Sequence, residues 1–363
     1  MQDLAIVFDD LIQFGGAERL LLAVTELWPH APVYTSVASK NWQSLCKSKN
    51  IKLVTSFMKY LPFKEKLNRF YSPLLAHILA FESFDFSEFK VVLSISARYA
   101  HMITTKPGTK HVCYMNTPGR PFWEPFNYFE NERLKSGLLN MSLSHIRQAD
   151  FTAAQRVDTF IANSHVPKAR IKKYYRRDAA VIFPFVDTAI YEKLQPEEGG
   201  YFLVITRLIP WKKVHIAVEA CEKQNLKLIV VGEGPDSVRL KKLSNGTTTF
   251  LGFVSDQKKK EVLSGCTALI QTQYEDFGIA PLEALACGKP VIAYGKGGVL
   301  EIVEEGKTGE FFSAQNSESL AAVLRGFKAT AYSQFDCRLR AKSFDKMIFQ
   351  KWLKSYIVNM IYS

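Results

Sequence analysis

The sequence has 363 residues, of which 47% are hydrophobic, so the chain is long enough for two globular domains and too apolar to be disordered. Its formal net charge of +12 predicts attraction to polyanions, whether nucleic acid, an anionic membrane surface or phosphorylated ligands. The amino terminus lacks the basic region and apolar core of a signal peptide, and no apolar run is long enough to span a bilayer. We therefore expect a cytoplasmic protein.

The first predicted unit is a strand, a glycine pair and a helix. Residues 4–8 form a continuous apolar run that is typical of a buried parallel strand, and a helical pattern follows over residues 17–27. Gly15 and Gly16 lie between them, in a loop that could receive a phosphate or a sugar. A plain tight turn would explain the glycine pair equally well.

Residues 59–89 are basic and aromatic first and then apolar. Interleaved cations and large apolar side chains indicate an amphipathic segment that could lie at a lipid interface. An ordinary surface helix with inward-packed aromatic rings would have the same pattern.

Two further strands are predicted over residues 91–95 and 111–114, and the second leads into Asn116. Ligands bind at the carboxyl ends of parallel strands in α/β folds, so Asn116 is a candidate substrate contact. Its amide can hydrogen-bond a hydroxyl group but cannot transfer a proton at neutral pH. His101 is near Asn116 in sequence and could supply the proton transfer that Asn116 cannot, although we expect His101 to be structural.

The end of the first domain combines a strand, a basic helix and a linker. Residues 158–162 read as a strand, and Asn163 or Ser164 can cap the helix that follows. Its basic run over 168–177 could contact nucleic acid, but no nucleic-acid motif accompanies it, so a solvated or membrane-facing surface is favoured. Residues 181–187 are predicted as the last strand, and the polar, Pro- and Gly-rich stretch 195–200 as the linker.

The second domain restarts with a strand over residues 201–206, which Arg207 closes before Lys212 opens a helix. Cations at this place would clamp a diphosphate and neutralise the charge that builds on it as a glycosidic bond breaks, although a chance solvated pair would look the same. The next strand, 226–231, ends in a Gly-x-Gly turn that is only part of a dinucleotide-binding fingerprint. Residues 249–254 and 268–272 read as two more strands.

The most informative stretch runs from residue 275 to residue 293. Pro281 suits the first position of a helix that Gly288 ends, and residues 291–293 form the next strand. The loop before that helix is therefore a candidate anion site, built from free amides and the positive end of the helix dipole.

Two carboxylates, Glu275 and Glu283, flank this loop. A carboxylate repels phosphate but accepts hydrogen bonds from sugar hydroxyls, so a sugar nucleotide would satisfy the loop and both carboxylates. The alternative is that Glu275 is solvated and Glu283 only caps its helix.

The Glu-x7-Glu spacing, with Glu-Ala-Leu-Ala-Cys-Gly-Lys-Pro-Val-Ile-Ala beginning at Glu283, resembles the retaining glycosyltransferases of family 4 and, within them, mannosyltransferases of bacterial surface polysaccharides such as O-antigen. The resemblance covers nearly the whole chain and implies an α/β, GT-B fold: two Rossmann-like doubly wound domains that face each other across a cleft. We expect an acceptor-side domain over 1–190, a nucleotide-sugar-binding domain over 199–342, and a C-terminal helix over 343–363 that packs back on the first domain.

The resemblance also implies roles for single residues. Arg207 and Lys212 would bind the donor diphosphate, Glu283 the ribose and Glu275 the hexose, with Val254 beside the nucleotide base. The remaining donor contacts would be made by backbone groups of Gly15, Gly16, Phe277, Gly278, Ile279 and Ala280. Asn116 stands where the family motif Tyr-x-His-Thr-Pro-x-Arg-x-x-Trp has histidine, so it joins the catalytic set as a substrate contact and not as a base.

The implied reaction transfers a hexose, with mannose from GDP-mannose as the leading donor, to a lipid-linked saccharide acceptor. No Asp-x-Asp motif stands out, so no metal or other cofactor is expected, and peripheral contact with the inner face of an anionic membrane fits the basic composition. The rivals are a non-catalytic sugar-nucleotide or polyanion-binding protein, which Asn116 and the basic surface support, and, more distantly, a nicotinamide oxidoreductase. The six scattered cysteines indicate reduced, buried thiols, without a disulfide framework or a zinc site.

Overall fold

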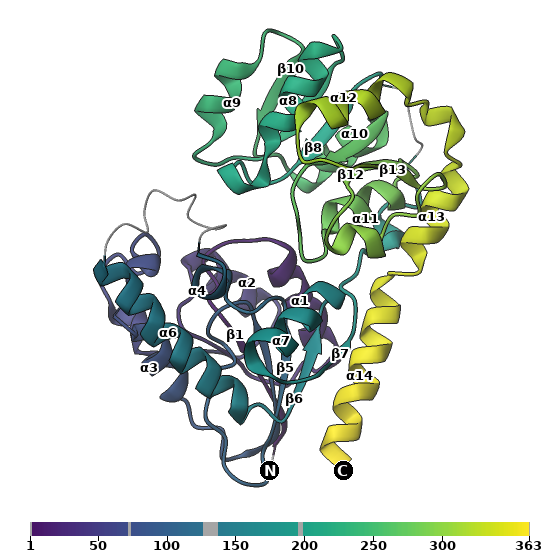
Figure 1. The fold of residues 1–363 in the computed structure, drawn as a ribbon. Helices are drawn as coiled ribbons and strands as arrows, with labels where there is room; N and C mark the ends of the chain where they lie inside the picture. Colours follow the sequence, from purple (N-terminus) through teal and green to yellow (C-terminus); the bar gives the residue numbers. More distant parts are fainter. Residues whose placement is uncertain (1, 72–73, 126–136, 195–198, 363) are drawn as a thin grey trace. The chain divides into compact units, whose positions relative to one another are not determined.

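The computed structural model describes residues 2–71, 74–125, 137–194 and 199–362 (Figure 1). The chain divides into two compact units, unit 1 (Met1–Phe183 with Phe349–Ser363) and unit 2 (Pro184–Ile348). The predicted linker begins at residue 195, and its first four residues, 195–198, lie outside the described residues.

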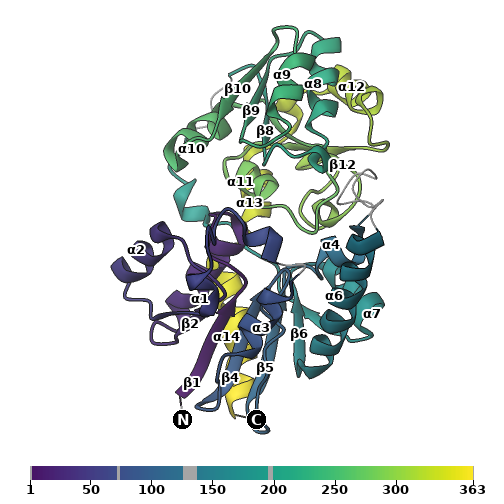
Figure 2. The ribbon, with the colours of Figure 1, turned by 90° about the vertical axis from the view of Figure 1, so that its left-hand side faces the viewer.

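Unit 1 is built on a seven-stranded parallel sheet with the order β3-β2-β1-β4-β5-β6-β7, and helices cover both of its faces (Figures 1 and 2). The strands are β1 (Gln2–Phe8), β2 (Val33–Thr35), β3 (Leu53–Thr55), β4 (Phe89–Ser96), β5 (Lys110–Met115), β6 (Thr159–Ala162) and β7 (Ala179–Val181). The helices are α1 (Gly16–Leu27), α2 (Lys40–Ser48), α3 (Ala76–Glu82), α4 (Arg120–Trp123), α6 (Gly137–Arg156) and α7 (His165–Tyr175), with the short 3-10 helices η1 (Phe57–Tyr60) and η2 (Asn68–Tyr71).

The C-terminal helix α14 (Lys346–Tyr362) belongs to unit 1 from Phe349 onward. Cys113 and Met115 of β5 pack into the core beneath α6 and α7, so the alternation of a strand turns Tyr114 to the other face. There its ring meets Phe349 edge-on at 6.0 Å. Gln350 Nε2 also donates to the Ala23 carbonyl at 3.0 Å, which ties α14 to α1.

Unit 2 has a six-stranded parallel sheet with the order β10-β9-β8-β11-β12-β13. The strands are β8 (Phe202–Ile205), β9 (Leu228–Val231), β10 (Thr248–Gly252), β11 (Ala268–Gln271), β12 (Val291–Tyr294) and β13 (Gly309–Phe312). The helices are α8 (Val214–Lys223), α9 (Ser237–Leu243), α10 (Asp256–Gly265), α11 (Ile279–Ala286), α12 (Ser317–Gly326) and α13 (Gln334–Lys342), with 3-10 turns η4 (Thr188–Ile190), η5 (Pro210–Lys212), η6 (Gly298–Glu301) and η7 (Ala329–Ala331).

Both sheets reverse their strand order at one place. In unit 1 the reversal falls between β1 and β4, and in unit 2 it falls between β8 and β11. Ligands of doubly wound folds bind outside the carboxyl ends of the strands at such a switch point. The loops after β8 and β11 are therefore the first place to look for a site in unit 2.

The structure corrects several predicted elements. The strand predicted over residues 181–187 is wrong beyond its first residue: β7 ends at Val181, and Pro184 supplies no N–H for a ladder. Strand β10 ends at Gly252, whose φ of 68° turns the chain, and not at Val254. The single surface helix that was the alternative for residues 59–89 does not form: the described part of this stretch contains η1, η2 and α3. The three-residue strands β2 and β3, and also β13, were not predicted.

The prediction of reduced, buried cysteines is confirmed. All six cysteines are buried and none forms a disulfide. Within the described ranges, no helix is both long enough and apolar enough to cross a membrane.

Candidate functional site

Lys212 is held at the switch point of unit 2. The chain leaves β8, passes through the exposed Arg207 and turns in η5, where Lys212 is only 8% exposed. Its ammonium lies 4.2 Å from the centroid of the Trp211 ring, so a cation–π contact helps to fix it. Lys212 Nζ donates a hydrogen bond to Oε1 of Glu275. The structure thus brings together two residues that the sequence had assigned to one ligand.

Several polar contacts fix the loop after β11 around this ion pair. Glu275 Oε1 also accepts from Gln273 Nε2 at 3.1 Å. Thr272 Oγ1 donates to the Lys212 carbonyl at 2.9 Å, and Gln315 Nε2 donates to the Thr272 carbonyl at 2.9 Å. Because the loops after β8 and β11 are bonded to each other, the cation and the carboxylate form one preorganised locus.

Helix α11 begins at the end of the same loop. Gly278, at φ 113°, precedes its first residue, Ile279. Pro281 is therefore the third helical residue, whereas the sequence predicted it as the first. The first amides of a helix have no acceptor within it, and they carry the positive end of its dipole. The helix ends as predicted: Gly288 has φ 77°, and Lys289 N bonds to Ala284 O at 2.9 Å, which closes a Schellman turn.

Two glycines after β12 support the Glu275 loop from behind. Gly298 N donates to the Glu275 carbonyl at 2.9 Å. A Cβ at Gly298 would lie 2.2 Å from Asp276 O, and a Cβ at Gly297 would lie 2.5 Å from Glu275 O. Only glycine permits these backbones to lie so close.

Gly298→Ala is expected to lower turnover about 100-fold, because the added methyl group must displace the backbone that carries Glu275. A steady-state assay with a nucleotide sugar, the substrate that the sequence predicts, measures the effect. Gly326→Ala is the matched control, since a Cβ there meets nothing within 4 Å. Equal activity of the two variants would show that the glycine contact does not position the site.

Glu283 is not a helix cap. It is the fifth residue of α11, is 6% exposed, and binds Lys259 Nζ of α10 through Oε1 at 2.5 Å. Lys259 was not predicted as a site residue. It is the middle one of three adjacent lysines, 258–260, and its partner lies on another helix. The phase of α10 turns Lys259 toward α11, while Lys258 pairs with Glu261 on its own helix.

The Gly-x-Gly turn after β9 has a packing role. A Cβ at Gly232 would lie 1.8 Å from Thr206 O, and one at Gly234 would lie 2.1 Å from Leu208 O. The two glycines therefore let this turn pack on the chain that leads from β8 to Lys212. Glu233 Oε1 in turn accepts from Phe253 N at 3.3 Å, which fixes the loop holding the half-buried Val254.

The carboxyl ends of β1 and β4 in unit 1 are joined by Asp9. Its carboxylate accepts four backbone N–H bonds, from Ala97, Arg98, Tyr99 and Ala100, at 2.6 to 3.0 Å. Asp10 beside it binds Arg98 NH2 at 2.6 Å, and this carboxylate holds the pKa of the Arg98 guanidinium above its usual range. The sequence analysis did not single out this cluster.

Gly15 and Gly16 lie in the loop between β1 and α1, where Gly15 caps the helix in an extended conformation. A Cβ at Gly15 would lie 3.2 Å from Glu18 Oε2. Glu18 itself is 3% exposed, and burial raises its pKa to about 7. The predicted glycine loop thus covers a carboxyl group that ionises near neutral pH.

Stability should depend on pH through Glu18. In the unfolded chain the carboxyl ionises near 4.5, whereas in the folded chain it stays protonated up to about 7. The folded state binds more protons between these values, so stability falls as pH rises through that window. Glu18→Gln should therefore stabilise the protein by roughly 1–3 kcal/mol at about pH 8 and leave it unchanged at about pH 4.

Urea unfolding across that pH range measures this effect. Glu26→Gln, at an exposed position of the same helix, should leave the pH dependence as it is in the wild type. Parallel stability curves for the wild type and Glu18→Gln would contradict the assignment.

Asn116 follows β5, where its N–H donates to the Ser96 carbonyl at 2.8 Å. Behind it, His101 is fully buried, with Nδ1 3.0 Å from Ser96 Oγ and Nε2 3.1 Å from Asp150 Oδ1. The other oxygen of Asp150 accepts from Trp123 Nε1 at 2.7 Å. His101 is therefore structural, and it cannot act in place of the histidine that Asn116 replaces.

Some side chains of the predicted basic run 168–177 make hydrogen bonds and ion pairs within the protein. Arg170 is 8% exposed and binds Glu124 at 2.7 Å, and Arg177 NH2 donates to the Asp158 carbonyl at 3.0 Å. Ser164 caps the helix, as one of the two predicted residues. Helix α7 ends at Tyr175, so Arg177 lies beyond it. With these two arginines committed to internal contacts, the predicted basic run 168–177 offers less charge to a polyanion than the sequence suggested.

The predicted site residues fall into two groups. In unit 2, Arg207, Lys212, Glu275 and the start of α11 share the switch point, while Glu283 and Val254 lie toward α10. Phe277 is 3% exposed and its ring lies 5.8 Å from that of Phe344, so only its backbone could meet a ligand. Gly15, Gly16 and Asn116 belong to unit 1. Over the part of the chain that is described, no group of three or more His, Cys, Asp or Glu residues could hold a metal ion.

Comparison with known proteins finds relatives of the segment that holds the unit 2 site. Residues 186–339 match the family described as glycosyl transferases group 1. The human alpha-1,3/1,6-mannosyltransferase ALG2 is 28% identical over 251 residues, which are 59% of this chain and 58% of that protein. The chain spans about half the length of the curated relatives that it matches.

Solved structures share the fold along the whole chain. HepE of Anabaena in complex with UDP-glucose has a TM-score of 0.69 at 19% identity and covers 98% of this chain and 99% of its own. Sucrose-phosphate synthase of Thermosynechococcus elongatus has a TM-score of 0.73 at 15% identity, with 100% of both chains covered. The predicted fold of two Rossmann-like domains of the GT-B class is therefore confirmed.

Proposed function

We propose that the chain is a retaining glycosyltransferase of family 4 that moves a hexose from a nucleotide sugar to a saccharide acceptor, which the match of residues 186–339 to glycosyl transferases group 1 supports. The observation that carries this proposal is the Lys212–Glu275 pair at the β8/β11 switch point, next to the first amides of α11. These groups match the two parts of such a donor, a diphosphate and a sugar.

The site residues divide the chemistry between them. As the glycosidic bond breaks, negative charge builds on the leaving diphosphate, and the Lys212 ammonium, the Arg207 guanidinium and the α11 amides would stabilise it. Glu275 would accept a hydrogen bond from a hydroxyl group of the hexose, and Glu283 one from the ribose. With this much positive charge in place, we propose that transfer needs no metal ion.

GDP-mannose is the proposed donor, which the similarity to the ALG2 mannosyltransferases supports. The proposed acceptor is a lipid-linked saccharide in the synthesis of a surface polysaccharide such as O-antigen. Unit 1 would receive the acceptor at the inner face of the membrane, with Asn116 as a substrate contact, while Gly15 and Gly16 would close over the sugar and phosphate of the donor. The net charge of +12 favours such an anionic surface.

The test is incubation of the purified chain with radiolabelled GDP-mannose and a lipid extract that contains lipid-linked saccharides. Label should move into the lipid fraction, with release of GDP. A second donor, UDP-glucose, controls for the nucleotide, since the HepE structure holds that compound. If neither donor is hydrolysed or used for transfer, the enzyme assignment is refuted.

One observation favours a rival, a non-catalytic sugar-nucleotide-binding protein. Asn116 cannot transfer a proton, and the buried His101 does not replace it. Saturable binding of the donor with no turnover in the same assay would establish this second function.

A further inference from the structure

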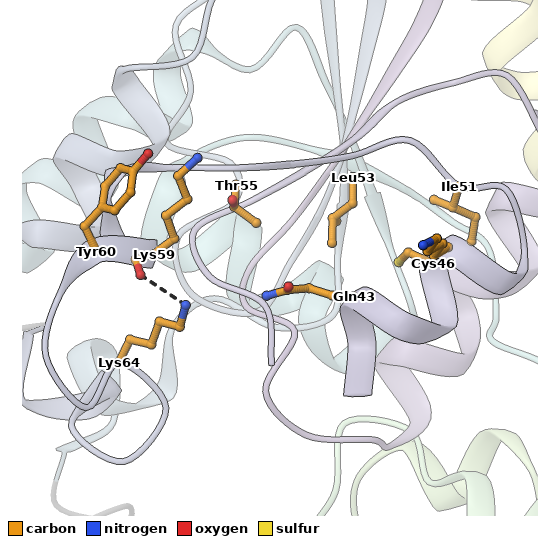
Figure 3. Close-up of a pocket in the computed structure, with 9 residues that line it drawn as sticks. Gln43, Cys46, Ile51, Leu53, Thr55, Lys59, Tyr60 and Lys64 are labelled. Atoms are coloured by element: carbon orange, nitrogen blue, oxygen red, sulfur yellow. Dashed lines mark hydrogen bonds between the residues drawn. The ribbon is translucent and has the colours of Figure 1, made fainter. Parts of the chain in front are cut away.

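Unit 1 has a hollow at the edge of its sheet that none of the proposed donor contacts reaches. It lies between α2, β3 and the turn 59–64 and has a volume of about 600 Å³. Polar side chains from all three elements line it: Gln43, Lys47, Thr55, Lys59, Tyr60 and Lys64. Figure 3 shows Lys64 and Ile51 toward opposite ends of the hollow, with Thr55 and Leu53 of β3 between them. We call it the lysine hollow.

Among the residues that the structure describes, none that lines the lysine hollow supplies a negative charge. Three ammonium groups line it, from Lys47, Lys59 and Lys64, and no carboxylate does. Lys64 Nζ donates to the Lys59 carbonyl at 3.0 Å, and Lys59 Nζ lies 4.9 Å from the Tyr60 ring centroid. Among the described ion pairs, none involves these three lysines. Three like charges around one space favour an anion within it.

The turn that carries Lys59 and Lys64 is fixed to the rest of unit 1 by hydrogen bonds and a buried side chain. Ser56 Oγ donates to the Ser36 carbonyl at 2.7 Å and accepts from Met58 N at 3.1 Å, which starts η1. Met58 is 1% exposed and fixes that helix to the core. Tyr71 OH donates to the Pro62 carbonyl at 2.6 Å and closes the other end. The hollow is therefore part of the fold and not a chance gap between loose side chains.

An apolar rim continues from the same turn. Phe57, Tyr60 and Phe63 are 41%, 79% and 73% exposed, which is unusual for three aromatic side chains within seven residues. A ligand that combines an anionic group with an apolar part would match the hollow and its rim together.

We infer that the lysine hollow binds the phosphate or diphosphate group of a molecule that also has an alkyl part. Phosphate suits it because three ammonium groups, the Gln43 amide and the Thr55 hydroxyl together supply more donors than one carboxylate can accept. The site is separate from the proposed donor site and needs no glycosyl transfer, so the failure of either proposal leaves the other standing.

The experiment measures binding of three phosphate probes to the full chain by calorimetry or vesicle sedimentation. Inorganic pyrophosphate tests the anion alone, farnesyl diphosphate tests the anion with an alkyl chain, and phosphatidylglycerol vesicles test a bilayer surface, with phosphatidylcholine vesicles as the neutral blank. Two triple variants are compared with the wild type. One replaces Lys47, Lys59 and Lys64 by glutamine; the other replaces Lys49, Lys106 and Lys110, which are exposed and line no part of the hollow.

Both triple variants lower the formal charge by the same amount, from +12 to 12 − 3 = +9, so a general charge effect would weaken binding equally in both. We expect the hollow variant to bind farnesyl diphosphate at least about tenfold more weakly, and the control variant to bind it as the wild type does. Preference for vesicles over farnesyl diphosphate, with the same loss in the hollow variant, would identify a bilayer lipid as the source of the phosphate. Equal binding by the two variants, or no binding of any probe to the wild type, would overturn the inference.

Discussion

Replacing Lys212 by methionine is expected to lower turnover of the nucleotide sugar about 10³-fold, because it removes the ammonium that we propose stabilises the leaving diphosphate. Methionine keeps the length and most of the volume of the side chain, so the packing beside Trp211 should survive. Glu275 would lose its ion-pair partner but keep its hydrogen bond from Gln273. Initial rates over a range of donor concentrations measure the effect.

The control is Lys223→Met, which breaks an exposed ion pair with Glu318 at the other end of α8. Exposed pairs contribute little, so this variant should keep wild-type turnover and stability. If Lys212→Met folds like the wild type and retains more than a tenth of its turnover, Lys212 does not stabilise the diphosphate.

Glu283→Gln is expected to abolish the thermal stabilisation that the donor gives to the wild type. A ligand present at 100 times its Kd stabilises a folded protein by about 2.7 kcal/mol, and loss of the proposed ribose contact should remove most of that. The experiment compares melting temperatures with and without a panel of sugar nucleotides. Glu261→Gln is the matched control, because this exposed glutamate also pairs with a lysine of α10.

A second variant separates binding of the ribose from a structural role. Glu283 binds Lys259, so its loss could act through that lysine alone. Lys259→Gln breaks the same pair and leaves the carboxylate in place. We expect Lys259→Gln to keep at least half of the donor stabilisation; if it loses as much as Glu283→Gln does, the ion pair rather than the carboxylate matters.

The sequence predicted those parts of the fold that depend on local signals. The apolar run that became β1 is buried on both faces, and Gly288 ends α11 because a positive φ is required there. The three-residue strands β2 and β3 were missed because so short a run carries no clear periodicity. Pro281 was placed at the first helical position because that is its usual place. The helix in fact begins two residues earlier, at Ile279, directly after Gly278.

The site residues were predicted from the spacing of charged residues in the sequence. That spacing does not reveal which side chains these residues contact in the folded chain. Lys212 and Glu275 were each assigned to a ligand, but their direct pairing joins residues 63 apart in sequence and follows from the adjacency of β8 and β11. Lys259 was invisible for the same reason, since its partner lies on another helix. The four amides on Asp9 come from a loop about 90 residues away, which no local pattern could reveal.

The most direct test of the central claim is a crystal structure of the chain with GDP-mannose. The account predicts that the diphosphate lies within hydrogen-bonding distance of Lys212 Nζ and the first amides of α11, with Glu275 turned to the hexose. A diphosphate bound away from Lys212 and from the start of α11, for example in the lysine hollow of unit 1, would contradict it.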